Sequence, residues 1–302
     1  MKRTAWRAAG LSLTLAGLVI GAPAATALAS GTPVRSGVIY SSMPGHPAPG
    51  NLPSLGAEAY SFNELGNEIT FAGTHRSLTS VTVLLSSWAC VSGNWFANDC
   101  ATPPGSTFQM PITLNIYHAA AGSDTPGSLI TSVTQTFSIP YRPSASPQCE
   151  STDPGTWYQL STGQCFNGLA TPVTFRFGGQ GVTVPDEIVY GVAYNTTHHG
   201  YHPIGNMPCD STSQGCPYDS LNIALSEDPV NVTSGTDPNP GTIWWDTSVA
   251  GFYCDGGAAG VGIFRMDSPG QDNNCWSVNS TAAPWEAPYY VPAVQFKASQ
   301  SG

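Results

Sequence analysis

The chain has 302 residues and carries 9 Lys and Arg against 19 Asp and Glu, a formal net charge of −10. This sign argues against nucleic acid or an anionic membrane surface as a partner. Only 9% of the residues are charged, far below the roughly 25% of an ordinary globular protein. The polar surface therefore consists mainly of hydroxyl and amide groups.

Residues 1–29 have the features of a secretory signal peptide. Three basic residues precede an apolar run over 11–20, and small residues occupy 25–29, so we expect cleavage after Ala29. This leaves 302 − 29 = 273 residues with a charge of 6 − 19 = −13. No second long apolar run follows, which predicts a secreted, extracellular chain without a membrane span after signal cleavage. Residues 30–55 are rich in Pro and Gly and should run extended to a single domain at 56–298.

Short stretches of alternating apolar and polar residues predict strands along the whole domain. They lie at 68–71, 78–88, 111–118, 129–139, 173–177, 188–194, 220–225, 242–245, 262–266 and 291–296. The Gly- and Pro-containing turn at 122–127 should join two of them into a hairpin. Because no amphipathic helix or internal repeat accompanies them, we predict an all-β, antiparallel, jelly-roll-like β-sandwich with long disulfide-stapled loops.

The segment 171–205 organises this prediction. Val173, Phe175 and Phe177 share one face of a strand, because side chains alternate with a period of two. The strand at 188–194 is apolar on both sides, which is typical of a central strand covered on both faces. Gly191 in its middle indicates a bulge or the close approach of another element.

Eight cysteines, all after the signal peptide, predict four disulfides in an exported chain. They come as four nearby couples, which favours pairing Cys90 with Cys100, Cys149 with Cys165, Cys209 with Cys216, and Cys254 with Cys275. Each bond should contribute roughly 2 to 4 kcal/mol by restricting the unfolded chain. The competing interpretation, a zinc site, lacks any C-x-x-C pair.

Four segments resemble those of secreted bacterial β-sandwich proteins in the group called choice-of-anchor proteins. They read SLGAEAYSFNELGNEITFAG, LTSVTVLLSSWAC, PITLNIYHAAAGSDTPGSLITSVTQTFSIPYRP and IVYGVAYNTTHHGYHPIG. The resemblance extends from about Val38 to Phe296 and implies a β-sandwich fold and export. It implies no catalytic or binding residue, because the group has no established activity. This chain differs from anchored members in having no recognisable anchor.

Two segments contain metal-ligand residue types. His198, His199 and His202 offer imidazoles to a transition metal, with His198 and His202 able to converge. The alternative is a polar turn that closes onto nearby tyrosines. The segment 267–274, which contains Asp267 and Asp272, offers oxygen ligands that suit a structural calcium ion. The alternative is a turn in which carboxylates cap backbone amides. We expect no other cofactor.

Aromatic residues cluster late in the chain and suggest a binding surface. Flat rings stack on sugars, so a glycan groove would suit this group. Its members are Trp244, Trp245, Tyr253, Trp276 and Trp285. The alternative is core packing, because adjacent tryptophans point to opposite sides of a strand.

No catalytic motif is present: G-x-S-x-G, H-E-x-x-H and the phosphate-binding loops are all missing. The leading hypothesis is a non-catalytic protein that binds a polysaccharide or another cell-envelope component. A glycan-active hydrolase is the first alternative. It requires two carboxylates facing across a groove lined by tryptophan, drawn from Glu58, Glu64, Glu68, Asp186, Glu187 and Asp246. The second alternative is a structural envelope or matrix protein, which would self-associate.

Overall fold

The structure is a computed structural model of the 302-residue chain. The structure describes residues 36–45, 52–95, 97–178, 181–194, 220–267 and 289–300. The chain divides into two units, Met1–Val34 and Arg35–Gly302. Every described residue belongs to the second unit, whereas the predicted signal peptide lies outside the described residues.

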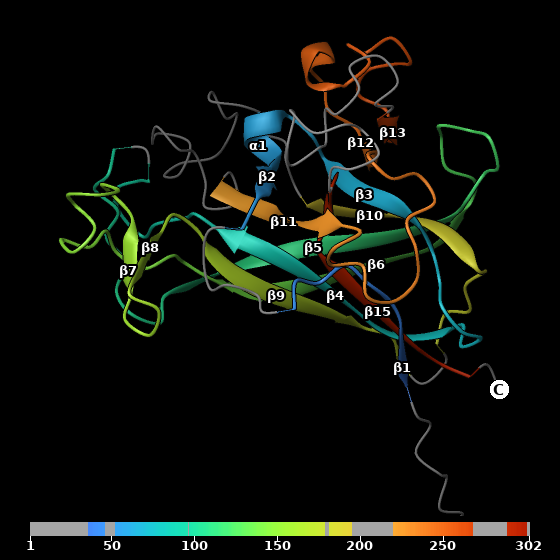
Figure 1. Ribbon diagram of the computed structural model, residues 1–302, viewed down its shortest axis with the longest axis horizontal. Coiled ribbons are helices and arrows are strands. Elements are labelled where there is room, and N and C mark those ends of the chain that lie inside the picture. The colour runs from blue at the N-terminus through green and yellow to red at the C-terminus, as the bar shows by residue number, and fades with distance from the viewer. Residues whose placement is uncertain are drawn as a thin grey trace, which may run out of the picture. The chain divides into compact units, whose positions relative to one another are not determined.

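Seven antiparallel strands form the first sheet (Figure 1). Its path runs through β1 (Gly37–Ser41), β15 (Val294–Ser299), β4 (Ser77–Ser87), β11 (Leu221–Asp228) and β14 (Tyr289–Pro292). Two further strands join from the side: β2 (Ser54–Gly56) pairs with β11, and β9 (Leu169–Arg176) pairs with β4. The first and last strands of the described domain are therefore direct neighbours.

Six antiparallel strands form the second sheet. In order they are β13 (Arg265–Asp267), β12 (Ile243–Trp245), β3 (Glu64–Thr70), β10 (Glu187–Tyr194), β5 (Thr107–His118) and β6 (Leu129–Pro140). A separate small hairpin consists of β7 (Trp157–Gln159) and β8 (Gln164–Phe166). Two short helical turns complete the described elements, α1 (Ala57–Tyr60) and the 3-10 turn η3 (Ala250–Phe252).

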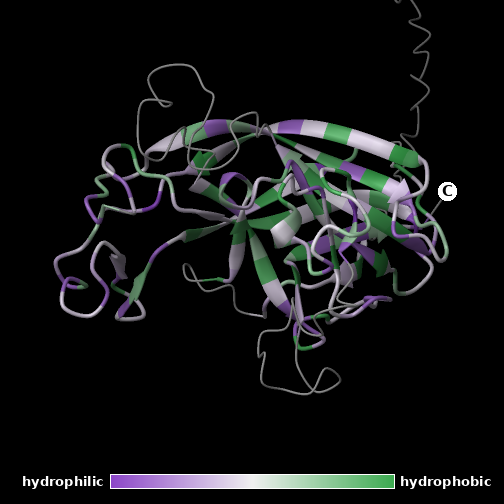
Figure 2. Ribbon diagram, turned by 90° about the horizontal axis from the view of Figure 1, so that it is seen from above, coloured by the Kyte–Doolittle hydropathy of each residue, from purple (hydrophilic) through white to green (hydrophobic). Residues whose placement is uncertain are grey.

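The two sheets pack face to face around one apolar core. Green and pale or purple residues alternate along the long strands in Figure 2, as a period of two requires when one face is buried. Rings from opposite sheets meet in this core: Tyr190 contacts Phe296 at 5.3 Å between centroids, and Phe137 contacts Phe175 at 5.1 Å. The predicted antiparallel β-sandwich is confirmed.

The chain crosses repeatedly between the two layers, which gives the jelly-roll-like connectivity. The chain passes from β3 to β4 in the other sheet and returns for the hairpin of β5 and β6. It then crosses to β9, returns to β10 and crosses again to β11. The predicted hairpin is confirmed, with Leu114 opposite Val133. In the described part of the chain, no helix is long and apolar enough to cross a membrane.

The central strand β10 is covered on both faces, as its composition predicts. Tyr190 and Val192 point into the core and Val189 points away from it, yet all three are fully buried. Gly191 is required for a close approach, because a Cβ there would overlap Glu64 Oε1. At the N-terminus, β1 lies within the segment predicted to run extended toward the domain, and it pairs with β15.

Candidate functional site

Two of the predicted disulfides are confirmed, Cys90–Cys100 and Cys149–Cys165, with Cα–Cα distances of 5.5 and 5.9 Å. Both hold the loops at the end of the sandwich that carries β7 and β8 (Figure 1). Cys254 is also disulfide-bonded. Its predicted partner Cys275 and the predicted pair Cys209–Cys216 lie outside the described residues.

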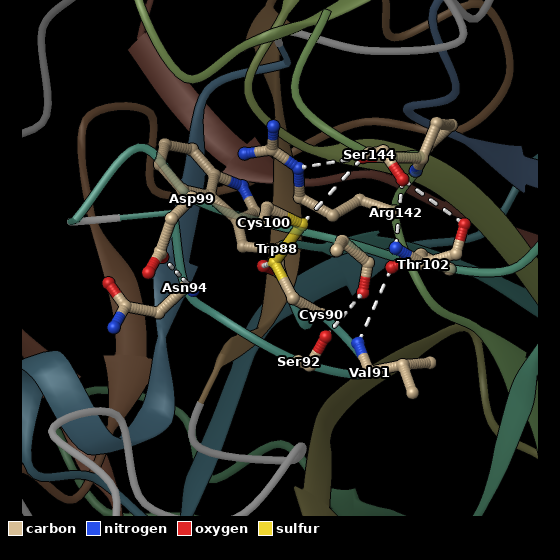
Figure 3. Close-up of a disulfide and its surroundings, with 12 residues drawn as sticks. Trp88, Cys90, Val91, Ser92, Asn94, Asp99, Cys100, Thr102, Arg142 and Ser144 are labelled. Atoms are coloured by element: carbon tan, nitrogen blue, oxygen red, sulfur yellow. Dashed lines mark hydrogen bonds between the residues drawn. A yellow bond between two sulfur atoms is a disulfide. The ribbon is translucent and has the colours of Figure 1, made fainter.

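A buried arginine anchors the loops beside the first disulfide (Figure 3). Arg142 is fully buried, and its guanidinium donates hydrogen bonds to the carbonyl oxygens of Pro143 and Gly155. Burial lowers the pKa of Arg142 to about 10, and the charge of Asp153 acts in the opposite direction. The arginine is thus held by backbone carbonyls, which fixes the path of the chain on both sides of it.

Further hydrogen bonds join the loop after Cys100 to the loop after β6. The Ser144 hydroxyl accepts from the Thr102 amide at 2.8 Å and donates to the Thr102 carbonyl at 3.2 Å (Figure 3). The Ala145 amide donates to the Cys100 carbonyl at 2.9 Å, and the Tyr141 amide donates to the Ser106 carbonyl at 3.1 Å. Together with the disulfide, these bonds hold the two loops in one arrangement.

A pocket of about 580 Å³ opens between these two loops, and we call it the stapled pocket. No charged side chain lines it. Its walls are five prolines (103, 104, 140, 143 and 147), five hydroxyl residues (Thr102, Ser106, Thr107, Ser144 and Ser146), three rings (Tyr141, Trp157 and Tyr158), and Gly105, Ala145 and Leu169.

The three rings of the stapled pocket are fixed to different degrees. Tyr141 packs against Phe108 at 5.0 Å between centroids, and Trp157 packs against Phe166 at 5.3 Å. Trp157 is buried and its indole donates to the Gly168 carbonyl at 2.9 Å, whereas Tyr141 and Tyr158 remain half-buried. Two tyrosine faces among small hydroxyls can hold an uncharged ligand with both apolar and hydroxyl surface.

The three late aromatic residues of the predicted group that the structure describes do not form an open surface. Trp244 and Trp245 are each 1% exposed and Tyr253 is 3% exposed, so none of the three offers a free ring face to a sugar. Trp245 points into the core, and its indole donates to Asp267 at 3.1 Å. Trp244 points to the other side, where Phe264 covers it at 6.1 Å between centroids. The other two members of the predicted group, Trp276 and Trp285, lie outside the described residues.

The metal-ligand candidates are described only in part. Asp267 is fully buried and accepts hydrogen bonds from the Trp245 indole and the Cys254 amide, a structural role for this carboxylate. His198, His202 and Asp272 lie outside the described residues. Within the described ranges, no three His, Cys, Asp or Glu side chains converge as a metal site would require.

A second pocket, of about 530 Å³, contains a pair of carboxylates on neighbouring strands. Glu68 of β3 and Glu187 of β10 lie on the same face of the sheet, within hydrogen-bonding reach of each other. Burial and the charge of Glu187 raise the pKa of Glu68 to about 7, and Asn239 donates to Glu68 at 2.6 Å. The like charge of Glu187 therefore favours the protonated form of Glu68.

This pair does not match the arrangement expected for a glycan hydrolase. Retaining and inverting glycosidases separate their carboxyl groups by about 5 to 10 Å, whereas Glu68 and Glu187 lie diagonally across neighbouring strands, within hydrogen-bonding reach of each other. No tryptophan lines their pocket. Asp186, another candidate, forms an exposed ion pair with Arg76 at 2.7 Å.

Glu64 occupies a third polar position, on the same face of β3 as Glu68. It accepts hydrogen bonds from Asn115 at 3.0 Å and Tyr117 at 3.1 Å. Burial raises its pKa to about 7, against the effect of these two donors. Asp246 lies near it and accepts from the amides of Asn63 and Glu64, so this carboxylate caps the start of β3.

The sequence did not indicate the stapled pocket. Its prolines and tyrosines come from three separate parts of the chain, 103–104, 140–147 and Tyr158, which show no common periodicity. The nearby cysteine couples were the one available signal, because they mark loops that are held in place. Comparison of the chain with protein-family models, curated proteins and solved structures finds no match.

Proposed function

We propose that the protein is a secreted, non-catalytic β-sandwich that binds a neutral extracellular glycan in the stapled pocket. The observation that carries this proposal is the composition of the pocket: two half-buried tyrosines and five hydroxyl residues, without a charged side chain. Aromatic faces suit the apolar faces of sugar rings, and hydroxyls suit their rims. A charged polysaccharide would find no opposite charge there.

The covalent and hydrogen-bonded restraints around the pocket support binding as its role. Loops that are already ordered lose little conformational entropy when a ligand binds. Here the Cys90–Cys100 bond and the paired contacts of Ser144 with Thr102 supply that order. Disulfides are typical of oxidising, extracellular compartments, and the resemblance to choice-of-anchor proteins also favours export.

A titration of the purified protein with neutral and acidic oligosaccharides, with and without a chelator, tests this proposal. We expect a neutral glycan to bind, and the Tyr158→Ala variant to bind it about tenfold more weakly because one stacking face is lost. Tyr60→Ala is the matched control, since Tyr60 is 37% exposed on α1 and contacts Phe252. No glycan binding, or equal affinity of wild type and Tyr158→Ala, would contradict the proposal.

A hydrolase is the second candidate function, favoured by the raised pKa of Glu68 beside Glu187. With this pKa, Glu68 could donate or accept a proton near neutral pH. Its spacing disfavours glycosidic chemistry, so the assay should include other polymer substrates. Loss of a measured activity in both Glu68→Gln and Glu187→Gln, with Glu150→Gln active, would establish it. A purely structural envelope role would show as self-association without ligand binding.

A further inference from the structure

The second sheet ends in an unusually long and uncharged edge strand. β6 has 12 residues, Leu129–Pro140, and pairs only with β5 among the residues that the structure describes. Its sequence, LITSVTQTFSIP, contains no charged residue and no proline before its last position. An edge strand exposes a row of backbone N–H and C=O groups that can pair with another strand.

The other edge strands of the described sandwich are short, charged or covered. β9 carries Pro172 and Arg176 within its 8 residues. β1 has 5 residues, and its Ile39 carbonyl already accepts from the Ala72 amide. β13 has 3 residues, and its Met266 amide donates to the Asp124 carbonyl. Natural sheets blunt their edges by such means. β6 is long and uncharged, and it meets the edge strand β9 through a side chain, where Gln135 donates to the Arg176 carbonyl at 3.1 Å.

The outward side chains of β6 suit pairing with an identical strand. Ser132, Thr134, Thr136 and Ser138 are exposed on one face, while Val133 and Phe137 pack toward the core. One hydroxyl pair of this kind already joins β6 to β5, where Thr113 and Thr134 are hydrogen-bonded at 2.7 Å. Thr and Ser pairs across antiparallel strands are favourable, and like charges opposite each other are not.

Charge also favours a second copy at this edge. The chain carries a net charge of −10, so two copies repel each other through most of their surface. At the uncharged strand β6, two copies can approach each other without placing like charges directly opposite one another. The register of β6 against β5 shifts once, near Tyr117 and Leu129, and is regular from Thr131 to Pro140, which leaves a continuous length for pairing.

We propose that β6 pairs antiparallel with β6 of a second copy of this chain, around a twofold axis. The two six-stranded sheets would then continue as one sheet across the dimer. A twofold interface places the same patch of both subunits in contact, which an antiparallel pair of identical strands satisfies. This interface is independent of the glycan proposed for the stapled pocket.

Sedimentation velocity over a range of protein concentrations tests the proposal, with a matched pair of variants. Ser138→Lys adds a charge on the edge strand, and Gln109→Lys adds the same charge directly opposite it on β5, one strand away from the edge. Both positions are exposed. We expect a reversible dimer whose dissociation constant rises roughly tenfold in Ser138→Lys and stays unchanged in Gln109→Lys.

Ser132→Lys provides a second edge variant, and circular dichroism establishes that each variant is folded. The combined Ser132→Lys/Ser138→Lys change should abolish the dimer at concentrations where the wild type is dimeric. A wild-type protein that stays monomeric at every concentration would overturn the proposal. A dimer that Gln109→Lys and the edge variants weaken equally would also overturn it, because the contact would then not be the β6 edge.

Discussion

Replacement of Asp237 by Asn should remove a large part of the pH dependence of stability. Asp237 is 9% exposed and lies in the segment between β11 and β12. Its carboxylate accepts hydrogen bonds from the Asn67 side chain at 2.9 Å and the Asn239 amide at 2.8 Å. Burial is the main reason that its pKa rises from 3.8 to about 7, and the charge of Asp228 adds to the effect.

The sign of the effect follows from this raised pKa. The folded state holds the proton more tightly than the unfolded state, so the contribution to stability is complete below about pH 4 and is lost as pH rises to about 7. The difference between about 7 and 3.8 corresponds to about 4 kcal/mol at 1.36 kcal/mol per pH unit. Because the residue keeps some contact with solvent, we expect a loss of about 2 to 4 kcal/mol.

Urea unfolding of wild type and Asp237→Asn between pH 4 and pH 8 measures this loss. Asn retains the shape of the side chain, and the amide of Asn67 can turn to present Oδ1, which has no hydrogen-bond partner in the wild type. The wild type should lose stability across this range relative to the variant. Asp186→Asn is the control, since its exposed ion pair with Arg76 is worth less than about 1 kcal/mol. Parallel pH profiles of wild type and Asp237→Asn would refute the reasoning.

Three further changes have expected outcomes in thermal or urea unfolding. Replacing Cys149 and Cys165 by Ser opens a loop with a sequence separation of 16, and should lower the free energy of unfolding by about 3 kcal/mol; a change below measurement error would contradict this. Trp245→Ala removes a fully buried indole and should lower the free energy of unfolding by about 3 to 5 kcal/mol. The urea midpoint should fall accordingly, and an unchanged midpoint would mean that the ring is not packed. Gly191→Ala should cost about 1 to 3 kcal/mol because its methyl group overlaps Glu64, and Glu64→Ala in the same chain should restore part of that loss.

The fold could be predicted from the sequence because its signal is local. Alternation at Val173 and Phe175 is enough to assign one buried face, and both side chains are buried. The pairings of Cys90 with Cys100 and of Cys149 with Cys165 could be predicted for the same reason. The cysteines of each pair are 10 and 16 positions apart and meet across a single loop. β1 could not be found this way, because its partner β15 lies at the other end of the chain.

The candidate site could not be predicted, because exposure depends on what covers a side chain. Nothing in the sequence near Trp244 shows that Phe264 packs over it. The pairing of Glu68 with Glu187 likewise depends on the register between β3 and β10, in which Glu68 faces Val189. The stapled pocket is a product of loops, whose shape is set by contacts between distant segments rather than by periodicity.

The pairing of β1 with β15 has a mechanical consequence. Gly37 faces Ala298, and Ser41 faces Gln295, so the chain enters and leaves this antiparallel pair at the same end. A pulling force applied through both tails would therefore break the hydrogen bonds between β1 and β15 one after another, starting at the Gly37 end. It would not load all of these bonds at once, as a shear force would. A protein pulled by its two ends would therefore unfold first at the β1–β15 pair, at low force. β1 would detach before the remaining strands of the sandwich were loaded.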